Sequence, residues 1–492
     1  MDMEETRFSY VYRNIRRRID DGLLKPGDRL PSARQLSDEF QIGIFTIKKA
    51  MAALKNEGLI LIEPRRAPVV ADQAPGSEEQ YEEAVILSQK NMILSVWQTI
   101  ALLMPSIFTF ASQDCHIEAL PHYKQAMRAG KGNITGAWRP LNLLCKEILD
   151  ASDNPLFSHL FATFDLYTCL PYFTEKSTYF IDEFLRPADR VTFAIIEALK
   201  MESRVEKCQY IRRMYQALHD DIRLSIDNLE RKFSKSPPHV HRSFSHAQFI
   251  WKPDRGRDYQ YLRIVQNLTS KIEKGVLPIG SMVYESALAE EYAVSVSTVR
   301  NALAILRQRG FVQTINGKGS QIVLPAQENI VYTPLLSPIR KNIIQYLNAL
   351  QFMILISGPC AYYAASHNLS EDIEWLEKQA GKSGIALLSN LFQSVLNHID
   401  VEPLRIILGT VNQMIKWGYY LVFYTWESQT VGQIGQLSHK AFKNLQNEDY
   451  MGFANEFSNC YRCILENVRE YMAVNYHLRG ALGVQTPPPM PL

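Results

Sequence analysis

The stretch KPGDRLPSARQLSDEFQIGIFTIKKAMAALKNEGLI, residues 25–60, predicts two short helices joined by a tight turn. Pro31-Ser32 opens a helix over Ala33 to Phe40, since proline suits a first helical turn and serine caps free amide groups. Four residues, Gln41 to Ile44, then lead into a helix over Phe45 to Gly58. The pattern predicts a helix-turn-helix at the centre of this stretch.

The flanks of this stretch complete a larger motif. Upstream, Arg7 to Asp21 predicts a basic amphipathic helix with three apolar residues at a spacing of four, Val11, Ile15 and Ile19. Downstream, the apolar runs Leu59 to Ile62 and Val69 to Val70 predict a two-stranded wing. Helix, helix, turn, helix and hairpin, in this order, are typical of a winged helix-turn-helix.

A second copy of the pattern lies 252 residues downstream. FTIKKAMAALKNEGLI (45–60) aligns with STVRNALAILRQRGFV (297–312), and DDGLLKPGDRL (20–30) aligns with EKGVLPIGSMV (273–283). In the segments between, Asn154-Pro155-Leu156 stands where Glu402-Pro403-Leu404 stands. We therefore expect a tandem repeat of two units of about 250 residues.

The long segments that follow each copy predict helical bundles, because they have long apolar-periodic stretches with proline and glycine mainly at breaks. The expected fold class is mainly α, with two winged helix-turn-helix domains, each carrying a small β-wing, alternating with two all-helical bundles. The predicted domains are 1–72, 80–233, 255–325 and 330–482, separated by polar linkers around 71–79, 234–256 and 325–329. The proline-rich end TPPPMPL is expected to be disordered.

The two copies resemble the GntR family of bacterial transcriptional regulators. The resemblance rests on KPGDRLPSARQLSDEF and FTIKKAMAALKNEGLI in the first copy, and on LAEEYAVSVSTVRNALAILRQRGFV and the wing GKGS in the second. It covers roughly 65 residues in each half and implies DNA binding. The sequence departs from the family where a Ser-Arg pair usually precedes the recognition helix, since it has Gly43-Ile44 in the first copy and Ser295-Val296 in the second.

A recognition helix needs polar side chains at its exposed start and cations nearby for phosphates. In the first copy the predicted DNA contacts are Arg34, Thr46, Lys48, Lys49, Arg65 and Arg66. In the second copy they are Ser295, Ser297, Thr298, Arg300, Gly317, Lys318 and Gly319. Residues 7–66 hold 13 Lys and Arg against 7 Asp and Glu, a net charge of +6, and residues 255–324 hold 9 against 5, a net charge of +4. Because the whole chain has a net charge of +2, the remaining residues carry −8. Basic charge is thus concentrated where phosphate contact is predicted.

The second helical segment resembles the ligand-binding domain of the FadR-type branch of the family, through GPCAYYAASHNLSEDIEWLEKQ (358–379) and SHKAFKNLQNEDYMGFANEF (438–457). Many such domains hold a divalent metal with one Asp and three His. Here the corresponding stretch, Ser389 to Gln393, lacks both of its ligands while His439 remains, so neither a metal nor another cofactor is expected. An aromatic run could line a pocket for a small-molecule effector, and packing between helices would explain it equally. Its residues are Tyr419, Tyr420, Phe423, Tyr424 and Trp426.

Two recognition helices in one chain predict an intramolecular pseudo-dimer, because dimeric regulators place two such helices on half-sites about one turn of DNA apart. Since the two helices differ, the operator should be asymmetric. The expected partners are double-stranded DNA and a small-molecule effector, and the chain is expected to act as a monomer or a homodimer. Two alternatives stay open. One winged helix could have lost DNA binding, or the chain could be a protein-interaction or structural component without an operator.

The composition, with 46% hydrophobic and 21% charged residues, is ordinary for a soluble globular protein. An odd count of seven cysteines and the lack of a signal peptide favour the reducing cytoplasm. The most apolar stretch, Ala349 to Ala365, is interrupted by Gln351 and Pro359 and predicts a buried core helix rather than a membrane span. No phosphate-binding loop, nucleophile elbow or cluster of His, Cys and carboxylates is present, so we do not expect an enzyme.

Overall fold

The structure is a computed structural model that describes residues 7–20, 24, 27–40, 43–63, 66–71, 78–129, 134–169, 173, 189–234, 248–253, 260–273, 276–308, 310–315, 319–323, 337–367, 369–380, 384–422, 428–475 and 477–491. Contacts between residues divide the chain into two compact units, which separate near residue 256. Each unit contains a winged helix followed by a helical domain. The expected fold class, mainly α with small β-wings, is confirmed.

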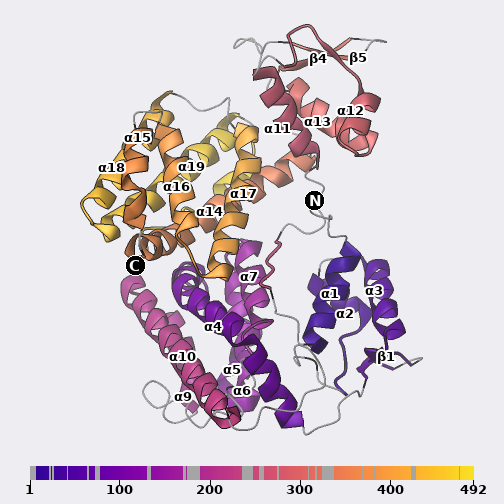
Figure 1. The fold of residues 1–492 in the computed structure, drawn as a ribbon, viewed down its shortest axis with the longest axis vertical. Helices are drawn as coiled ribbons and strands as arrows, with labels where there is room; N and C mark the ends of the chain where they lie inside the picture. Colours follow the sequence, from indigo (N-terminus) through magenta and orange to yellow (C-terminus); the bar gives the residue numbers. More distant parts are fainter. Residues whose placement is uncertain are drawn as a thin grey trace. The chain divides into compact units, whose positions relative to one another are not determined.

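The first winged helix has the predicted elements (Figure 1). Helices α1 (Arg7–Asp20), α2 (Ala33–Phe40) and α3 (Ile44–Asn56) precede the antiparallel strands β1 (Ile60–Leu61) and β2 (Val69–Val70). Helix α2 has the predicted bounds. At its start, the Ser32 N–H donates to Gln35 Oε1 at 2.8 Å and the Gln35 N–H donates to Ser32 Oγ at 3.3 Å, which is a capping box. The wing is also confirmed, although its paired strands are shorter than the apolar runs that predict them.

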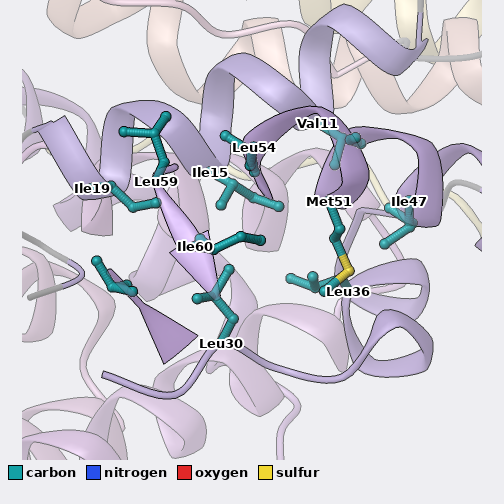
Figure 2. Packing of buried hydrophobic residues seen from close by; sticks show 12 residues of the cluster. Val11, Ile15, Ile19, Leu30, Leu36, Ile47, Met51, Leu54, Leu59 and Ile60 are labelled. Carbon is teal, nitrogen blue, oxygen red and sulfur yellow. The ribbon is translucent and has the colours of Figure 1, made fainter. Parts of the chain in front are cut away.

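The core of this domain joins all of its elements (Figure 2). Apolar residues three or four positions apart face inward from α1 and α3, and residues of α2 and the wing close the remaining side. The members, each at most 7% exposed, are Val11, Ile15, Ile19, Leu30, Leu36, Ile47, Ala50, Met51, Leu54, Leu59, Ile60 and Val70. Because burial of apolar surface is the main stabilising term, this core determines which face of α3 remains in solvent.

The second winged helix has the same order of helices and a third strand in its sheet. Its elements are α11 (Gln260–Glu273), β3 (Met282–Val283), α12 (Glu285–Glu291), α13 (Val296–Gln308), β4 (Val312–Ile315) and β5 (Gly319–Ile322). All pairings are antiparallel, and β5 lies between β3 and β4.

The turn after the first helix has the same geometry in both winged helices. Gly27 and Gly280 have φ angles of 88° and 90°, a region that glycine enters at little cost. The Gly27 N–H donates to the Val70 carbonyl oxygen at 3.0 Å, and the Gly280 N–H donates to that of Ile322 at 2.8 Å. The turn thereby ties the second strand of the wing to the chain that enters the second helix in each domain.

The described residues between and after the winged helices are predominantly helical, as predicted. The first helical domain contains α4 (Glu78–Ala111), η1 (Ile117–Ala119), α5 (Tyr123–Ala129), α6 (Ile134–Asp150), α7 (Pro155–Asp165), α9 (Asp189–Lys200) and α10 (Arg204–Phe233), with α4 packed along α10 (Figure 1). The second contains α14 (Ser337–Ser366), η2 (Leu369–Asp372), α15 (Ile373–Ala380), α16 (Gly384–Asn397), α17 (Glu402–Val422), α18 (Ser428–Gln446), α19 (Tyr450–Asn475) and η4 (Arg479–Gly483). Helix α19 packs against both α14 and α18.

Helices α4 and α14 are long and apolar enough to cross a membrane by length and composition alone. Their most apolar parts are, however, 78% and 89% buried within the protein. Packing of α4 on α10 and of α14 on α19 accounts for this composition. Helix α14 is therefore the buried core helix that the stretch around Ala349 to Ala365 predicts.

Part of the predicted linker over 234–256 is instead anchored to the first helical domain. The Phe249 and Trp251 side chains are each only 2% exposed. The Tyr167 hydroxyl accepts the Ile250 N–H at 2.9 Å, and the Tyr167 ring lies 5.0 Å from that of Phe249. Three adjacent apolar residues gain more from burial than from hydration, so this stretch before the expected domain boundary packs on the helical domain.

The proline-rich end of the chain is ordered up to Pro491, so the predicted disorder is wrong for these residues. Carbonyl oxygens near the end accept hydrogen bonds from α14 and α19. The Gln351 amide donates to the Gln485 oxygen at 2.7 Å, and Arg462 Nε donates to the Pro487 oxygen at 3.0 Å. Proline lacks an N–H but keeps its carbonyl, so long side chains from distant helices can hold such a segment.

Candidate nucleic-acid interface

Helix α3 of the first winged helix leaves one face to solvent. Its apolar side, with Ile47 and Met51, points into the core (Figure 2). The residues exposed at the start and middle of the helix are Ile44, Phe45, Lys48, Lys49 and Ala52. Because the first residues of a recognition helix contact base edges, this face has the placement that DNA recognition needs.

Helix α13 of the second winged helix exposes the equivalent positions, 252 residues further on. Val299, Ala302, Leu303 and Leu306 are buried. The exposed residues on the opposite side include Val296, Ser297, Arg300 and Asn301. Both winged helices therefore present the same side of the third helix, with a cation one turn after its start in each.

The start of α13 is capped by hydroxyl groups. Ser295 Oγ accepts the Thr298 N–H at 3.3 Å and lies 2.9 Å from Thr298 Oγ1 and 2.8 Å from Ser297 Oγ. Ser295 and Ser297 are exposed as expected, but Thr298 is only 5% exposed. The predicted DNA contact of Thr298 is therefore not supported, since its hydroxyl belongs to the cap. The equivalent Thr46 of α3 is half-buried.

The cations at the equivalent positions of α3 and α13 have different surroundings. Arg300 Nε donates to Glu285 Oε2 at 2.7 Å, and Glu285 stands at the first position of α12. The first winged helix has Ala33 at the first position of α2, and Lys48 forms no hydrogen bond or ion pair with any residue that the structure describes. Lys48 is thus free to reach a phosphate, whereas Arg300 is oriented by a carboxylate.

Lys49 lies toward α1 rather than straight into solvent. Its Nζ atom is 5.3 Å from the centre of the Phe8 ring, a cation–π distance. At the other end of α3, the Tyr12 hydroxyl of α1 donates to the Glu57 carboxylate. The same carboxylate accepts a hydrogen bond from Arg16 Nη1 at 3.1 Å. Burial and the hydrogen bond to Glu57 raise the pKa of Tyr12. These contacts fix α1 against the end of α3 and so hold the recognition helix in place.

The remaining predicted contacts lie on α2 and on the wings. Arg34 is exposed on α2, and Arg66 is exposed although it donates to Glu63 at 2.8 Å. Arg65, Gly317 and Lys318 lie outside the described residues. Gly319 has a φ of 110°, and a Cβ there would lie 3.2 Å from the Tyr284 ring and 3.3 Å from the Val283 oxygen, so its role is to shape the second wing.

Two exposed positions on these faces are absent from the predicted contacts, Phe45 and Asn301. The signal that could have found them is helical phase. Phe45 is one turn before Lys48 and Lys49, on the side opposite Ile47 and Met51. An apolar residue at the start of a helix is easily assigned to the core when polar character is the criterion.

The comparisons with known proteins agree with this geometry. The model of the bacterial regulatory proteins of the gntR family matches residues 9–70 and 260–322. Both winged helices match this family model. These two matches cover the whole of each helix-turn-helix and its wing, up to the second strand of the hairpin.

Two proteins similar to this chain are HTH-type transcriptional regulators. The HTH-type transcriptional regulator LutR of Bacillus subtilis is 23% identical over 145 residues, which cover 29% of this chain and 66% of LutR. The HTH-type transcriptional regulator YjiR of Escherichia coli is 29% identical over 96 residues, which cover 18% of this chain and 20% of YjiR. This chain therefore spans less than two thirds of the length of either relative.

Solved structures with low global similarity include a Streptococcus agalactiae GntR, at 15% identity and a TM-score of 0.21, covering 42% of this chain and 98% of that one. The Escherichia coli McbR/YncC structure has 17% identity and a TM-score of 0.21, covering 46% of this chain and 98% of that one.

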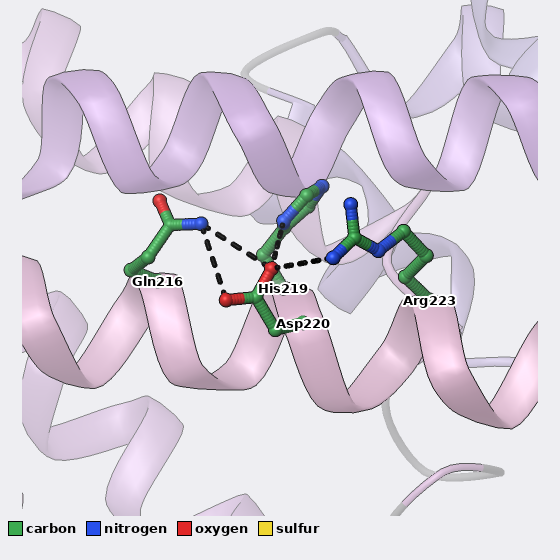
Figure 3. Close-up of polar contacts among 4 residues, drawn as sticks. All are labelled: Gln216, His219, Asp220 and Arg223. Atoms are coloured by element: carbon green, nitrogen blue, oxygen red, sulfur yellow. Dashed lines mark hydrogen bonds and ion pairs between the residues drawn. The ribbon is translucent and has the colours of Figure 1, made fainter.

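The helical domains contain polar contacts that stabilise helices rather than form a site. On α10, Gln216, His219 and Arg223 surround Asp220 at 3.3 to 3.4 Å (Figure 3). Pairs three or four residues apart on a helix surface contribute only about 0.2–0.5 kcal/mol each. Among the residues that the structure describes, no group of three or more His, Cys, Asp and Glu could hold a metal ion.

The predicted effector pocket of the second helical domain falls largely outside what is described. Phe423, Tyr424 and Trp426 lie outside the described residues, and the side chains of Tyr419 and Tyr420 are not placed. His439 is exposed, and its Nδ1 lies 2.8 Å from the Gly435 oxygen of the preceding turn.

The first helical domain has a deep-set carboxylate that sequence analysis did not single out. Burial raises the pKa of Asp165 at the end of α7 to about 6, against the opposing effects of a hydrogen bond from Asn142 and the charge of Arg18. Nearby, burial raises the pKa of Cys145 to about 12, so that thiol is an inert core group.

Proposed function

We propose that this chain is a transcriptional regulator in which both gntR-family domains bind the same DNA duplex. The observation that carries the proposal is the pair of exposed, cation-bearing faces on α3 and α13, each backed by a buried apolar side. A helix fits the major groove of B-DNA, which is about 12 Å wide, and flanking cations neutralise phosphates. The proposal gives the protein no enzymatic activity and places it in the cytoplasm.

The two faces suggest different contributions from their residues. We assign base contacts to Arg300 and Ser297, because an oriented guanidinium and an exposed hydroxyl can both bind base edges. We assign phosphate contacts to the remaining exposed or wing cations, Arg34, Lys48, Lys49, Arg65, Arg66 and Lys318. Ser295 caps α13 and Gly319 shapes the second wing, and we assign further contacts with the DNA backbone to Thr46 and Gly317 from their place in the motif.

We further propose that the chain acts as an intramolecular pseudo-dimer on an asymmetric operator, with domains over 1–72, 80–233, 255–325 and 330–482. The internal repeat supports this, since one chain supplies the two helices that a dimer would supply. The helical domains would pair the two winged helices and hold a small-molecule effector. The support for the effector is the FadR-type resemblance of the second helical domain.

Selection of bound sites from random duplex DNA tests the proposal. The wild-type chain should select two unlike half-sites about one helical turn apart. Lys48→Ala should weaken binding at one half-site and Arg300→Ala at the other. Arg223→Ala, an exposed arginine on α10, is the matched control and should select the wild-type sequence. Light scattering of the complex should give one chain per duplex, and an obligate dimer would contradict the pseudo-dimer.

A protein-interaction role without an operator is the competing function. Phosphate-dominated binding weakens steeply with salt, so measuring affinity from 50 to 200 mM salt separates the two. If the purified chain binds no duplex at low ionic strength, the regulator proposal fails and the interaction role takes its place.

A further inference from the structure

The recognition helix of the first gntR-family domain begins with an apolar tip. Phe45 is 81% exposed, more than any other large hydrophobic residue in the part of the chain that the structure describes, and the adjacent Ile44 is 44% exposed. Phe45 lies on the face of α3 that turns away from Ile47 and Met51, whereas Ile44, the first residue of the helix, is in phase with Met51. An exposed phenylalanine is costly in water, so a contact that covers it when DNA binds would gain free energy.

The neighbours of Phe45 indicate what would cover it. Lys48 and Lys49 follow one turn later on the same face, and Lys48 has no acidic partner among the described residues. An apolar protein interface would have to bury these two ammonium groups or pair them, whereas a DNA groove lies beside phosphates that pair with them directly. Charge therefore favours a duplex as the occupant of this face.

The major groove of DNA offers one apolar group, the C5-methyl of thymine. Guanine, cytosine and adenine edges present only hydrogen-bonding groups there, which an aromatic ring cannot satisfy. The second domain has Ser297 at the position of Phe45, and that hydroxyl is exposed and bonded to Ser295 at 2.8 Å. The two recognition helices thus differ in polarity at this position. The first has an apolar ring that could contact a methyl group, and the second has a hydroxyl that could form a hydrogen bond.

We propose that Phe45 determines specificity in the first domain by packing on a thymine methyl group of its half-site. This inference rests on the proposed DNA-binding function and names the chemistry that one of the two half-sites presents. It also gives the asymmetric operator a physical basis, because the first domain takes thymine where the second domain, through Ser297 and Arg300, takes a hydrogen-bonding edge.

Uracil substitution tests the inference on the full-length chain. After a bound site has been selected from random duplexes, each thymine of each half-site is replaced in turn by deoxyuridine, which pairs identically and lacks only the methyl. Loss of one buried methyl should weaken wild-type binding about three- to fivefold at one or two positions of the first half-site. Thymines in the second half-site should be insensitive to the replacement.

Two variants distinguish methyl recognition from a general effect on binding. Phe45→Ser, which copies the second domain, should bind thymine and uracil sites equally, while Phe45→Leu should keep part of the difference. Ser297→Phe should introduce uracil sensitivity into the second half-site. Because positions 45 and 297 are both exposed, unchanged thermal unfolding should accompany each variant.

The outcomes separate the two levels of the argument. If no duplex binds at low salt, the proposed function fails, and the inference fails with it. If a site is selected but uracil has no effect at any position, if the first half-site contains no thymine, or if Phe45→Ser keeps the uracil sensitivity, the inference is overturned while the regulator function stands. Binding of a protein partner that Phe45→Ser abolishes, with DNA affinity unchanged, would likewise overturn it.

Discussion

Replacing Glu285 with glutamine should make the second gntR-family domain less selective for DNA sequence without weakening its fold. The Glu285 carboxylate accepts the Nε–H of Arg300 at 2.7 Å. This leaves the terminal amino groups of the guanidinium available, and they are the groups that bind guanine O6 and N7 as a pair. Under the proposed function, Glu285 is a positioning residue, which acts on DNA through Arg300.

The size of the effect follows from the exposure of the pair. The Arg300 and Glu285 side chains are 66% and 37% exposed. Exposed ion pairs contribute about 0.2–1 kcal/mol, so the free energy of unfolding should change little. Ordering a long side chain on binding costs about 0.5–1.5 kcal/mol, so the variant should lose about two- to thirteenfold of its preference for the correct base pair. Affinity for unrelated DNA should rise, because a negative charge near the phosphates is removed.

Fluorescence anisotropy with two labelled duplexes measures this preference. One duplex carries the selected site, and the other has the base pair facing Arg300 changed. In an Arg300→Ala background, Glu285→Gln should no longer change the ratio of the two affinities. Glu456→Gln, which breaks the ion pair with Lys440 at 2.6 Å in the second helical domain, is the control for loss of a carboxylate. An unchanged ratio for Glu285→Gln, or an equal change with and without Arg300, would refute the positioning role.

Three further predictions concern stability. Burial lowers the pKa of His159 to about 4, so the neutral ring is favoured in the folded state. The free energy of unfolding should therefore be highest above pH 6.5 and should fall by about 3 kcal/mol as the pH drops toward 4. Denaturant unfolding of His159→Leu between pH 7 and pH 4 should show a weaker dependence, and an identical pH profile would contradict the assignment. Trp251→Ala should destabilise the first helical domain by about 3–5 kcal/mol, with a much smaller loss for Trp251→Phe, as hydrogen exchange of α7 would report; protection equal to wild type would mean that the anchor is dispensable. Gly319→Ala should cost the second winged helix about 1–3 kcal/mol in thermal unfolding, because its φ of 110° and the nearby Tyr284 ring exclude a side chain, and no shift would show that the wing adapts.

The surface that we propose to face DNA was only partly predictable from the sequence. Lys48 and Arg300 could be placed because a cation one turn into a recognition helix follows from the motif alone. Thr298 and Phe45 could not be placed on polarity, since the first is a buried cap and the second an exposed ring. What separates them is the phase of each helix against its own core, which is set by Ile47 and Met51 in one domain and by Val299 and Leu303 in the other.

The ion pair between Arg300 and Glu285 had no signal in the sequence, because the two residues belong to different helices. Their distance depends on how α12 packs against α13. The same applies to Asp165, whose pKa depends on burial and not on its neighbours along the chain.

By itself the sequence determined the local elements of this protein. Apolar residues at a spacing of four, a capping serine after proline, and glycines in left-handed turns fixed the helices and wings of both gntR-family domains, because these features act within a few residues. Only the tertiary structure decided that Trp251 is an anchor and that the proline-rich end is held by Arg462. Both depend on surfaces brought together from distant parts of the chain, and burial and hydrogen bonding between such surfaces leave no periodic signature in the sequence.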